Sequence, residues 1–120
     1  MKRDMDLARK ILQQIEEKSD GLRCESLDLP DHSRAEIAYH LKLLKEARLI
    51  EGLDFTSSET GLEIMPKCLT WQGHEFLDAI KNDTVWNKVK ETVKEKGGAI
   101  PFEILKAFAL QVAKGIFGIS

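Results

Sequence analysis

The sequence predicts a mainly α-helical protein with one small β-hairpin, and three observations support this fold class. In residues 33–50 a serine precedes apolar residues that recur at the spacing of a helix. Residues 49–55 and 62–69 flank the polar stretch TSSETG, and the apolar residues next to it alternate with polar ones (Leu53 and Phe55, Leu62 and Ile64), which is typical of a hairpin. Most other apolar residues also recur at helical spacing, in the ranges 4–18, 70–80, 84–96 and 102–117.

The segment 33–48 carries the clearest helix pattern. Ser33 and Glu36 have the spacing of a capping box, in which each side chain accepts a hydrogen bond from the other residue's backbone N–H. At about 100° per residue, Ile37, Leu41 and Leu44 form one apolar stripe. The residues off this stripe are Arg34, Ala35, Tyr39, Lys42 and Glu46. We therefore predict a helix with one face in the core and the other exposed.

The first helix and the segment after it have different patterns. Residues 4–18 are predicted as a helix that Asp4 or Asp6 caps. Its buried stripe is expected to consist of Leu7, Ile11, Leu12 and Ile15. Residues 22–32, LRCESLDLPDH, are predicted to be extended or to form one loose turn that ends near Pro30.

After residue 48 the sequence predicts the hairpin and then two further helices. Gly61 can supply the positive φ that the hairpin turn needs. Thr70 is expected to cap the helix 70–80, and the pair Asn82-Asp83 to start the helix 84–96. We interpret the large aromatic residues as core anchors of these helices, namely Trp71, Phe76 and Trp86.

The last helix, 102–117, begins after Pro101, which suits a first-turn position. It is apolar on more than one side, through Phe102, Ile104, Leu105, Phe108, Leu110, Val112, Ile116 and Phe117. Such a helix can complete the core of the monomer or pair with its copy in a homodimer. The extent of its apolar surface favours a homodimer through this helix.

The composition is that of an ordinary soluble protein. The chain has 120 residues, 42% hydrophobic residues and a net charge of −2, which argues against a generally basic nucleic-acid coat. Its two cysteines form no disulfide framework, so a reducing cytoplasmic location is expected. No signal-peptide pattern and no run of about 18 apolar residues occurs, so we expect no membrane contact. Residues 1–83 are predicted as the main domain and residues 84–120 as a C-terminal helical extension that belongs to the same compact unit.

Enzyme, metal and cofactor chemistry have little support in the sequence. It contains no glycine-rich phosphate loop, nucleophile elbow or paired-carboxylate motif. The residues that could bind a metal lack the spacing of a zinc site, namely Cys24, His32, His40, Cys68 and His74. We therefore expect no catalytic residue, no metal and no cofactor.

The helix 33–48 resembles the recognition helix of bacterial winged helix-turn-helix regulators of the arsenic-responsive and antibiotic-resistance types. Those helices read roughly S-x-x-x-φ-x-x-H-L-K-x-L-x-x-A-G-L-I. The residues that match are Ser33, Ile37, His40, Leu41, Lys42, Leu44, Ala47, Leu49 and Ile50. Arg48 replaces the usual glycine, so the chain either leaves the helix by a different route or tolerates a left-handed backbone that costs about 1 kcal/mol. The stretch L-T-x-x-G-x-x-x-L at 69–77 is similar to the segment that follows the wing in such regulators.

The whole chain also resembles a family of uncharacterised small proteins from bacteria and their phages, grouped as a domain of unknown function. The stretches that carry this resemblance are MKRDMDL, EIAYHLKLLKEARLIEG, LTWQGHEFLDAIKNDTVWNKVKE and KEKGGAIPFEILKA. The resemblance implies a winged helix-turn-helix fold, with the hairpin as its wing, and a phage or prophage context. It implies no particular activity.

These resemblances predict a small DNA-binding transcriptional regulator. The candidate contacts to double-stranded DNA are Ser33, Arg34, Ala35, Tyr39, His40 and Lys42. An arginine can form two hydrogen bonds to guanine, and a lysine can hold a phosphate. The helix N-terminus would add attraction for a phosphate.

The charge pattern leaves a second hypothesis open. Residues 33–48 carry four basic and two acidic side chains, whereas residues 49–69 carry one basic and four acidic ones. A hairpin that lies along phosphates is normally basic, so this one would be repelled. The alternative is a winged-helix protein-protein interaction module that does not bind DNA.

Overall fold

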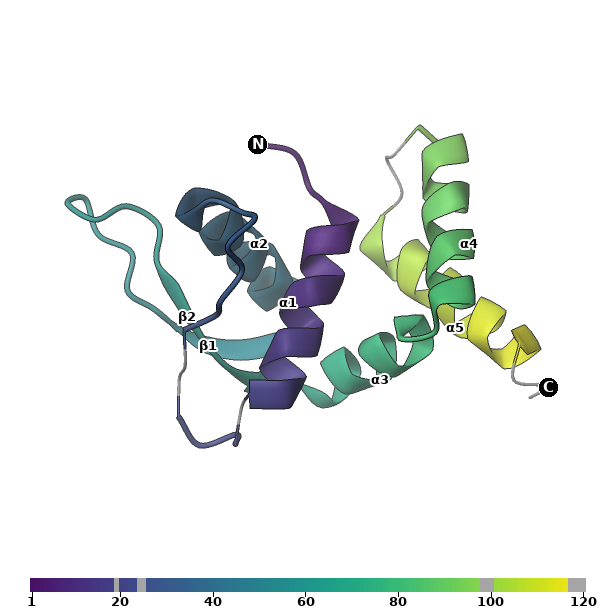
Figure 1. Cartoon of the computed structure of the whole chain (residues 1–120), viewed down its shortest axis with the longest axis horizontal. Coiled ribbons are helices and arrows are strands. Elements are labelled where there is room, and N and C mark those ends of the chain that lie inside the picture. The colour runs from purple at the N-terminus through teal and green to yellow at the C-terminus, as the bar shows by residue number, and fades with distance from the viewer. Residues whose placement is uncertain (19, 24–25, 98–100, 117–120) are drawn as a thin grey trace. The chain divides into compact units, whose positions relative to one another are not determined.

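The computed structural model describes residues 1–18, 20–23, 26–97 and 101–116 (Figure 1). Its elements in chain order are α1 (Met5–Lys18), α2 (Arg34–Glu46), β1 (Ile50–Asp54), β2 (Ile64–Leu69), α3 (Trp71–Ile80), α4 (Asp83–Glu95) and α5 (Phe102–Ile116). The chain is therefore mainly helical with one small antiparallel hairpin, which confirms the predicted fold class at this level.

Two compact units make up the chain, Met1–His74 and Glu75–Ser120. The division falls within α3, whereas the sequence placed a domain boundary between residues 83 and 84. The first unit holds α1, α2 and the hairpin, and the second holds α4 and α5.

Helix α1 begins after Asp4, as predicted. The Asp4 carboxylate Oδ1 accepts hydrogen bonds from the backbone N–H groups of Asp6 (3.0 Å) and Leu7 (3.2 Å), which satisfies two donors that the helix itself leaves open. All four residues of the predicted stripe are buried, namely Leu7, Ile11, Leu12 and Ile15. They form the core that α1 shares with α2 and β2.

The segment between α1 and α2 contains no helix in its described residues, in agreement with the sequence. Residues 26–29 are extended, and the Gln14 side chain of α1 binds both backbone groups of Asp28. The Gln14 Nε2 donates to the Asp28 carbonyl (2.8 Å), and the Asp28 N–H donates to Gln14 Oε1 (2.6 Å). Because the backbone N–H and carbonyl of Asp28 are bonded to Gln14, this residue does not pair with a strand of the hairpin.

Helix α2 is one residue shorter at its start than predicted and ends two residues earlier, because both ends are capped. Ser33 is the N-cap, and Ala47 is the C-cap. The Leu49 N–H donates to the Leu44 carbonyl (3.0 Å) and the Arg48 N–H to the Lys45 carbonyl (3.0 Å), the two bonds of a Schellman motif. Arg48 has φ +62°, so the chain tolerates the left-handed backbone rather than leaving by another route.

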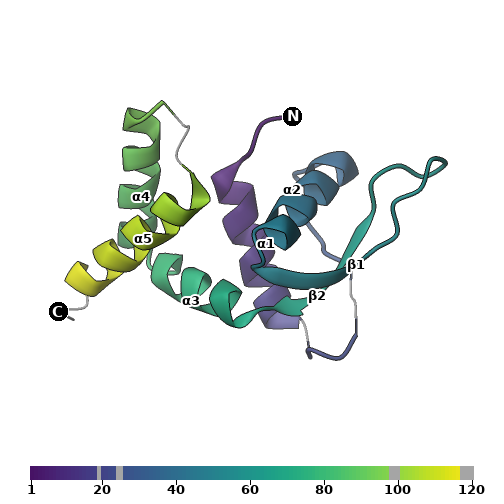
Figure 2. The same ribbon diagram turned by 180° about the vertical axis from the view of Figure 1, so that it is seen from behind.

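The hairpin lies beside α2 (Figure 2). Its strands pair antiparallel, with Ile50 opposite Leu69 and Asp54 opposite Ile64, and the register shifts once after residue 51. Both strands are shorter than the predicted ranges 49–55 and 62–69. Residue 49 belongs to the Schellman motif, and residue 55 lies beyond β1, where its N–H donates to the Glu63 carbonyl (2.8 Å). The turn uses Gly61 at φ +79°, as predicted.

Helix α3 is joined to the end of α2 by two close interactions. The Thr70 hydroxyl donates to the Arg48 carbonyl (2.7 Å) and accepts from the Gly73 N–H (3.0 Å), so it caps α3 and holds the turn after α2. A Cβ at Gly73 would overlap the Leu49 carbonyl oxygen, so only glycine allows this approach. Trp71 is 80% exposed, so its prediction as a core anchor is wrong. It precedes the buried Gly73 by two residues, which corresponds to about 200° around the helix, so the two residues lie on opposite faces of α3.

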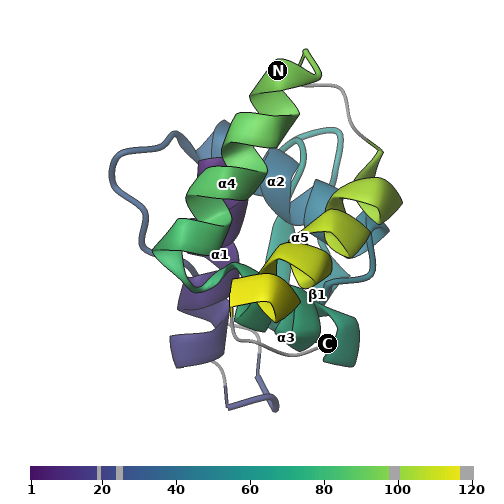
Figure 3. The same cartoon turned by 90° about the vertical axis from the view of Figure 1, so that its right-hand side faces the viewer.

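Helices α4 and α5 pack against each other in the second unit (Figure 3). Asn82 caps α4 through bonds to the Thr84 and Val85 N–H groups, as predicted. The buried residues of α4 and α5 are Val85, Trp86, Val89, Leu105, Ala109 and Ala113. Within the described part of the chain, no helix has both the length and the apolar character needed to cross a membrane. The sequence assigned further apolar residues to the surface of α5, and Phe117 and the side chains of Phe102 and Ile116 lie outside the described residues.

Candidate nucleic-acid interface

The outward face of α2 presents a strip of exposed polar and small residues. Its members are Arg34, Ala35, Lys42, Lys45 and Glu46. Arg34, Ala35 and Lys42 were predicted for this face. Lys45 was not, although it follows Arg34 by about three helical turns and therefore lies on the same side. That spacing is the signal that could have identified it.

Two of the cations on this face are paired with carboxylates. The Arg34 guanidinium lies 3.3 Å from Glu63 Oε1, which precedes β2, and Lys42 Nζ lies 3.2 Å from Glu46 Oε1 on the next turn. The Arg34 side chain is 81% exposed, so its pair is screened by water. Exposed pairs contribute about 0–1 kcal/mol, so a stronger anion can replace the carboxylate at little cost.

The N-terminus of α2 already holds a negative charge. The Glu36 N–H donates to Ser33 Oγ (3.1 Å), and the Ser33 N–H donates to Glu36 Oε1 (3.4 Å), which is the predicted capping box. The Ser33 N–H holds the pKa of Glu36 below its ordinary value, with smaller contributions from His32 and the Ser33 hydroxyl. Since the Glu36 carboxylate occupies this end of the helix, it would repel a phosphate, which the sequence analysis predicted to bind there.

His40 is not on the exposed face, and its prediction as a DNA contact is corrected by its burial. Only 2% of its surface is exposed, and the Asp4 N–H donates to its Nε2 at 2.7 Å. Tyr39 is half-buried, with its ring edge against the His40 ring at 5.7 Å between centroids. The reason is geometric: His40 follows Glu36 by one turn and lies beside the Leu44 stripe, on the side that meets α1.

The hairpin beside α2 is acidic. Hydrogen bonds from the Thr56 side chain and backbone N–H, together with the positive charge of Lys45, hold the pKa of Asp54 below its ordinary value. Asp54 is therefore charged near neutral pH. Glu51 and Glu59 are also exposed on this hairpin.

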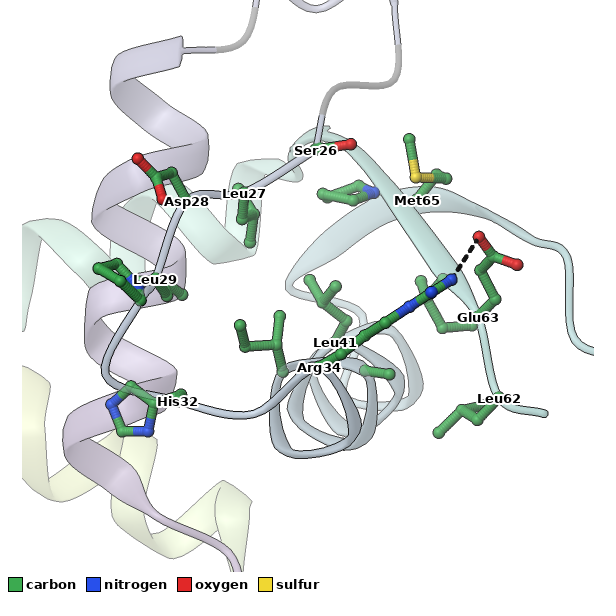
Figure 4. Close-up of a pocket in the computed structure, with 15 residues that line it drawn as sticks. Ser26, Leu27, Asp28, Leu29, His32, Arg34, Leu41, Leu62, Glu63 and Met65 are labelled. Carbon is green, nitrogen blue, oxygen red and sulfur yellow. Dashed lines mark hydrogen bonds and ion pairs between the residues drawn. The ribbon is translucent and has the colours of Figure 1, made fainter. Parts of the chain in front are cut away.

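A groove of about 430 Å³ opens next to Arg34 (Figure 4). It lies between the extended segment 26–30 and β2, and α2 forms its floor. The apolar residues that line it include Leu27, Leu29, Ile37, Leu41, Leu62 and Met65. Figure 4 shows the Arg34 side chain reaching across to Glu63 at one side of the groove. Ile37 is only half-buried for this reason, although the sequence assigned it to the core stripe.

The histidines and cysteines are dispersed. Among the described residues, no group of three or more histidine, cysteine or acidic side chains is arranged to bind a metal ion. The Cys68 thiol donates to Glu51 Oε2 (3.2 Å), and His74 Nδ1 lies 3.6 Å from Glu16 Oε2. Cys24 lies outside the described residues.

Comparison with known proteins gives a family and a relative. The model of the family described as "Hypothetical protein (DUF2513)" matches residues 2–99. A Haemophilus influenzae protein described as "Uncharacterized protein" is 42% identical over 113 residues, which cover 91% of this chain and 92% of the relative. No solved structure matches the chain.

Proposed function

The chain belongs to the DUF2513 family, and we propose that it is a small winged-helix regulator that binds double-stranded DNA through α2. The single observation that carries the proposal is the exposed strip on α2, in which Arg34, Lys42 and Lys45 lie next to a two-stranded hairpin within one compact unit. A capped helix beside a hairpin is the arrangement that winged-helix proteins use to enter a major groove.

The ion pairs of this face are compatible with DNA binding. The Arg34–Glu63 and Lys42–Glu46 pairs are exposed, so each contributes little to folding and can exchange its carboxylate for a phosphate or a base edge. The carboxylates then act as competitors for the two cations. This competition gives the proposal a specific test, because removing a competing carboxylate should strengthen DNA binding.

A homodimer would place two copies of α2 on one duplex. On α5, Ile104 is 60% exposed and Phe108, Leu110 and Val112 are half-buried, which leaves apolar surface for a second copy. Dimeric regulators of this kind read two half-sites whose separation matches the distance between their recognition helices. We propose α5 as the dimer contact.

A protein-interaction module is the second candidate, because the acidic hairpin favours it. Residues 49–69 carry four acidic side chains against Lys67. Such a surface suits a basic partner protein better than a phosphate backbone. Under this hypothesis the chain binds no duplex even at low salt.

The test compares matched variants on a labelled duplex obtained by selection from random sequences. We expect Arg34→Ala and Lys42→Ala each to weaken binding and to lower the dependence of log K on log salt by about one unit, because each removes one positive charge that neutralises a phosphate. Glu63→Gln should strengthen binding, since it frees Arg34. Lys88→Ala, on α4 in the other unit, is the control for the loss of one charge.

Two results would overturn the DNA proposal. One is the absence of duplex binding at about 50 mM salt, where non-specific binding is already strong. The other is a measurable affinity that neither Arg34→Ala nor Lys42→Ala changes, which would place the contact elsewhere. Either result leaves the protein-interaction module as the better hypothesis.

A further inference from the structure

A second concavity, of about 560 Å³, lies between the end of α2 and the hairpin. It shares no lining residue with the groove of Figure 4. Three cationic side chains line it, Lys45, Arg48 and Lys67, together with one carboxylate, Glu51. Its remaining lining residues are Ile50, Gly52, Leu53 and Thr70. All of them belong to the Met1–His74 unit.

Arg48 lines this concavity and has a strained backbone conformation. Its φ of +62° lies in the left-handed region, which glycine adopts without penalty and arginine does not. Among the described residues, it is the one with a positive φ that is not a glycine. Strained residues persist where neighbouring structure holds them, and they concentrate at functional positions.

The neighbouring structure does hold Arg48 firmly. The Thr70 hydroxyl donates to its carbonyl at 2.7 Å, and its own N–H donates to the Lys45 carbonyl at 3.0 Å. The Thr70 N–H also donates to the Leu49 carbonyl at 2.9 Å. None of these bonds uses the Arg48 side chain, so they hold the backbone at Arg48 and leave its side chain exposed.

The charges around the concavity favour a doubly or triply charged anion. Lys45 and Arg48 are exposed and Lys67 is half-buried, which places three positive charges around one opening. Glu51 lines the same concavity and Asp54 interacts with the charge of Lys45, so these two carboxylates offset part of the positive charge but are outnumbered by the three cations. A tetrahedral phosphate offers several acceptor oxygens to a guanidinium and two ammonium groups at once.

We propose that Lys45, Arg48 and Lys67 form a phosphate-binding site. The phosphate can belong to a nucleic-acid backbone or to a free phosphate compound, and the site does not require the proposed regulator function. An arginine at a position that suits glycine is explained if its side chain binds this anion.

The experiment titrates the full chain with inorganic pyrophosphate and, separately, with the selected duplex, and follows backbone amide NMR signals and affinity. With pyrophosphate we expect the signals of Lys45, Arg48, Lys67 and Thr70 to move. Arg48→Gly should weaken binding about tenfold, as expected for a charged hydrogen bond, and Lys67→Ala should also weaken it. Arg48→Gly should raise the thermal midpoint at the same time, so weaker binding cannot result from misfolding. Lys88→Ala is the matched charge control.

The outcomes separate this site from the regulator proposal. If both probes bind and both lose affinity in Arg48→Gly, the site holds the nucleic-acid backbone. If pyrophosphate alone binds in this manner, the site stands as one for free phosphate and the regulator proposal fails. If the duplex binds equally well to Arg48→Gly, Lys67→Ala and the unaltered chain, while pyrophosphate moves no signal at these residues, the site is overturned and the regulator proposal stands. Absence of binding to both probes overturns both.

Discussion

The Asp4 N–H donates a hydrogen bond to His40 Nε2 at 2.7 Å, and this bond joins the cap of α1 to the buried side of α2. The other ring nitrogen, Nδ1, lies 2.8 Å from the Glu36 carbonyl. A backbone N–H can only donate and a carbonyl can only accept, so Nε2 is the acceptor and Nδ1 carries the proton. His40 is thus a neutral structural residue with both ring nitrogens used.

His40→Ala should destabilise the first unit by about 2–3 kcal/mol, because it removes two hydrogen bonds, leaves the Asp4 N–H without its acceptor and opens a cavity. Chemical denaturation measures this change. The control is His74→Ala, whose partly exposed side chain faces Glu16 at the surface and whose loss should cost less than about 0.5 kcal/mol. Equal effects of the two substitutions would contradict the structural role of His40.

Arg48→Gly should raise the free energy of unfolding by about 1 kcal/mol, since glycine adopts the φ of +62° without strain. The gain is reduced by the greater flexibility of glycine in the unfolded chain. Thermal and urea denaturation measure it. Arg48→Ala keeps the strain and removes the same charge, so a gain in that variant would show that charge, not backbone conformation, is responsible.

Gly73→Ala should destabilise the protein by about 1–3 kcal/mol, because the added Cβ overlaps the Leu49 carbonyl oxygen. Alanine usually stabilises a helix relative to glycine, so the sign of the effect is informative. Gly115→Ala on α5 is the control, because a Cβ there meets no atom within 4 Å. It should be neutral or stabilising. A stabilising Gly73→Ala would disprove the close approach of α3 to Leu49.

The capping box of α2 should contribute to the dependence of stability on pH. The pKa of Glu36 is lower in the folded chain than its ordinary value of 4.5. A lowered carboxyl pKa stabilises the fold fully above pH 4.5, and this contribution is lost as the pH falls through the folded-state pKa. Glu36→Gln should therefore show a shallower loss of stability on acidification, measured by denaturation at a series of pH values.

The control for this pH experiment is Glu17→Gln, which removes an equal charge from an exposed position on α1. The difference between the two variants isolates the capping box. A pH profile that is the same for Glu36→Gln and Glu17→Gln would show that the Ser33–Glu36 interaction does not couple to folding.

The apolar surface of α5 should form a homodimer, and Ile104→Glu should break it. Ile104 is 60% exposed, so the substitution leaves the core of the monomer unchanged while it places a charge in the contact. Light scattering should give the mass of two chains for the unaltered protein and of one chain for the variant. Gln72→Glu, at an exposed polar position on α3 and so outside the proposed contact, is the control for added charge. A monomeric mass for the unaltered protein would exclude this contact.

Local signals explain how much of the fold the sequence could predict. The caps Asp4, Ser33 and Asn82 bind N–H groups two or three residues away, so sequence spacing alone reveals them. The hairpin turn at Gly61 and the absence of a helix from the described residues between α1 and α2 follow from local residue preferences in the same way. Trp71 was wrongly predicted to be buried. The face of α3 that is buried is set by the contact between Gly73 and Leu49, which no local sequence pattern indicates.

The candidate site was only partly predictable. Periodicity found Arg34 and Lys42 on the exposed face of α2, but it could not tell that Arg34 faces Glu63, which lies 29 positions later. It also left His40 at the edge of that face, although its partner Asp4 lies 36 positions earlier. The sequence showed that Lys45 and Arg48 are positively charged, but not that they lie near Lys67. The turn after α2 and the position of the hairpin bring the three side chains around one concavity.

By itself the sequence determined the helices, the hairpin and their boundaries to within a few residues, because capping and side-chain periodicity act between neighbours along the chain. The tertiary structure alone decided which charges meet, which histidine is buried and where an arginine adopts a left-handed backbone. Those outcomes depend on hydrogen bonds and packing between residues far apart in sequence, and such contacts exist only once α1, α2 and the hairpin have come together.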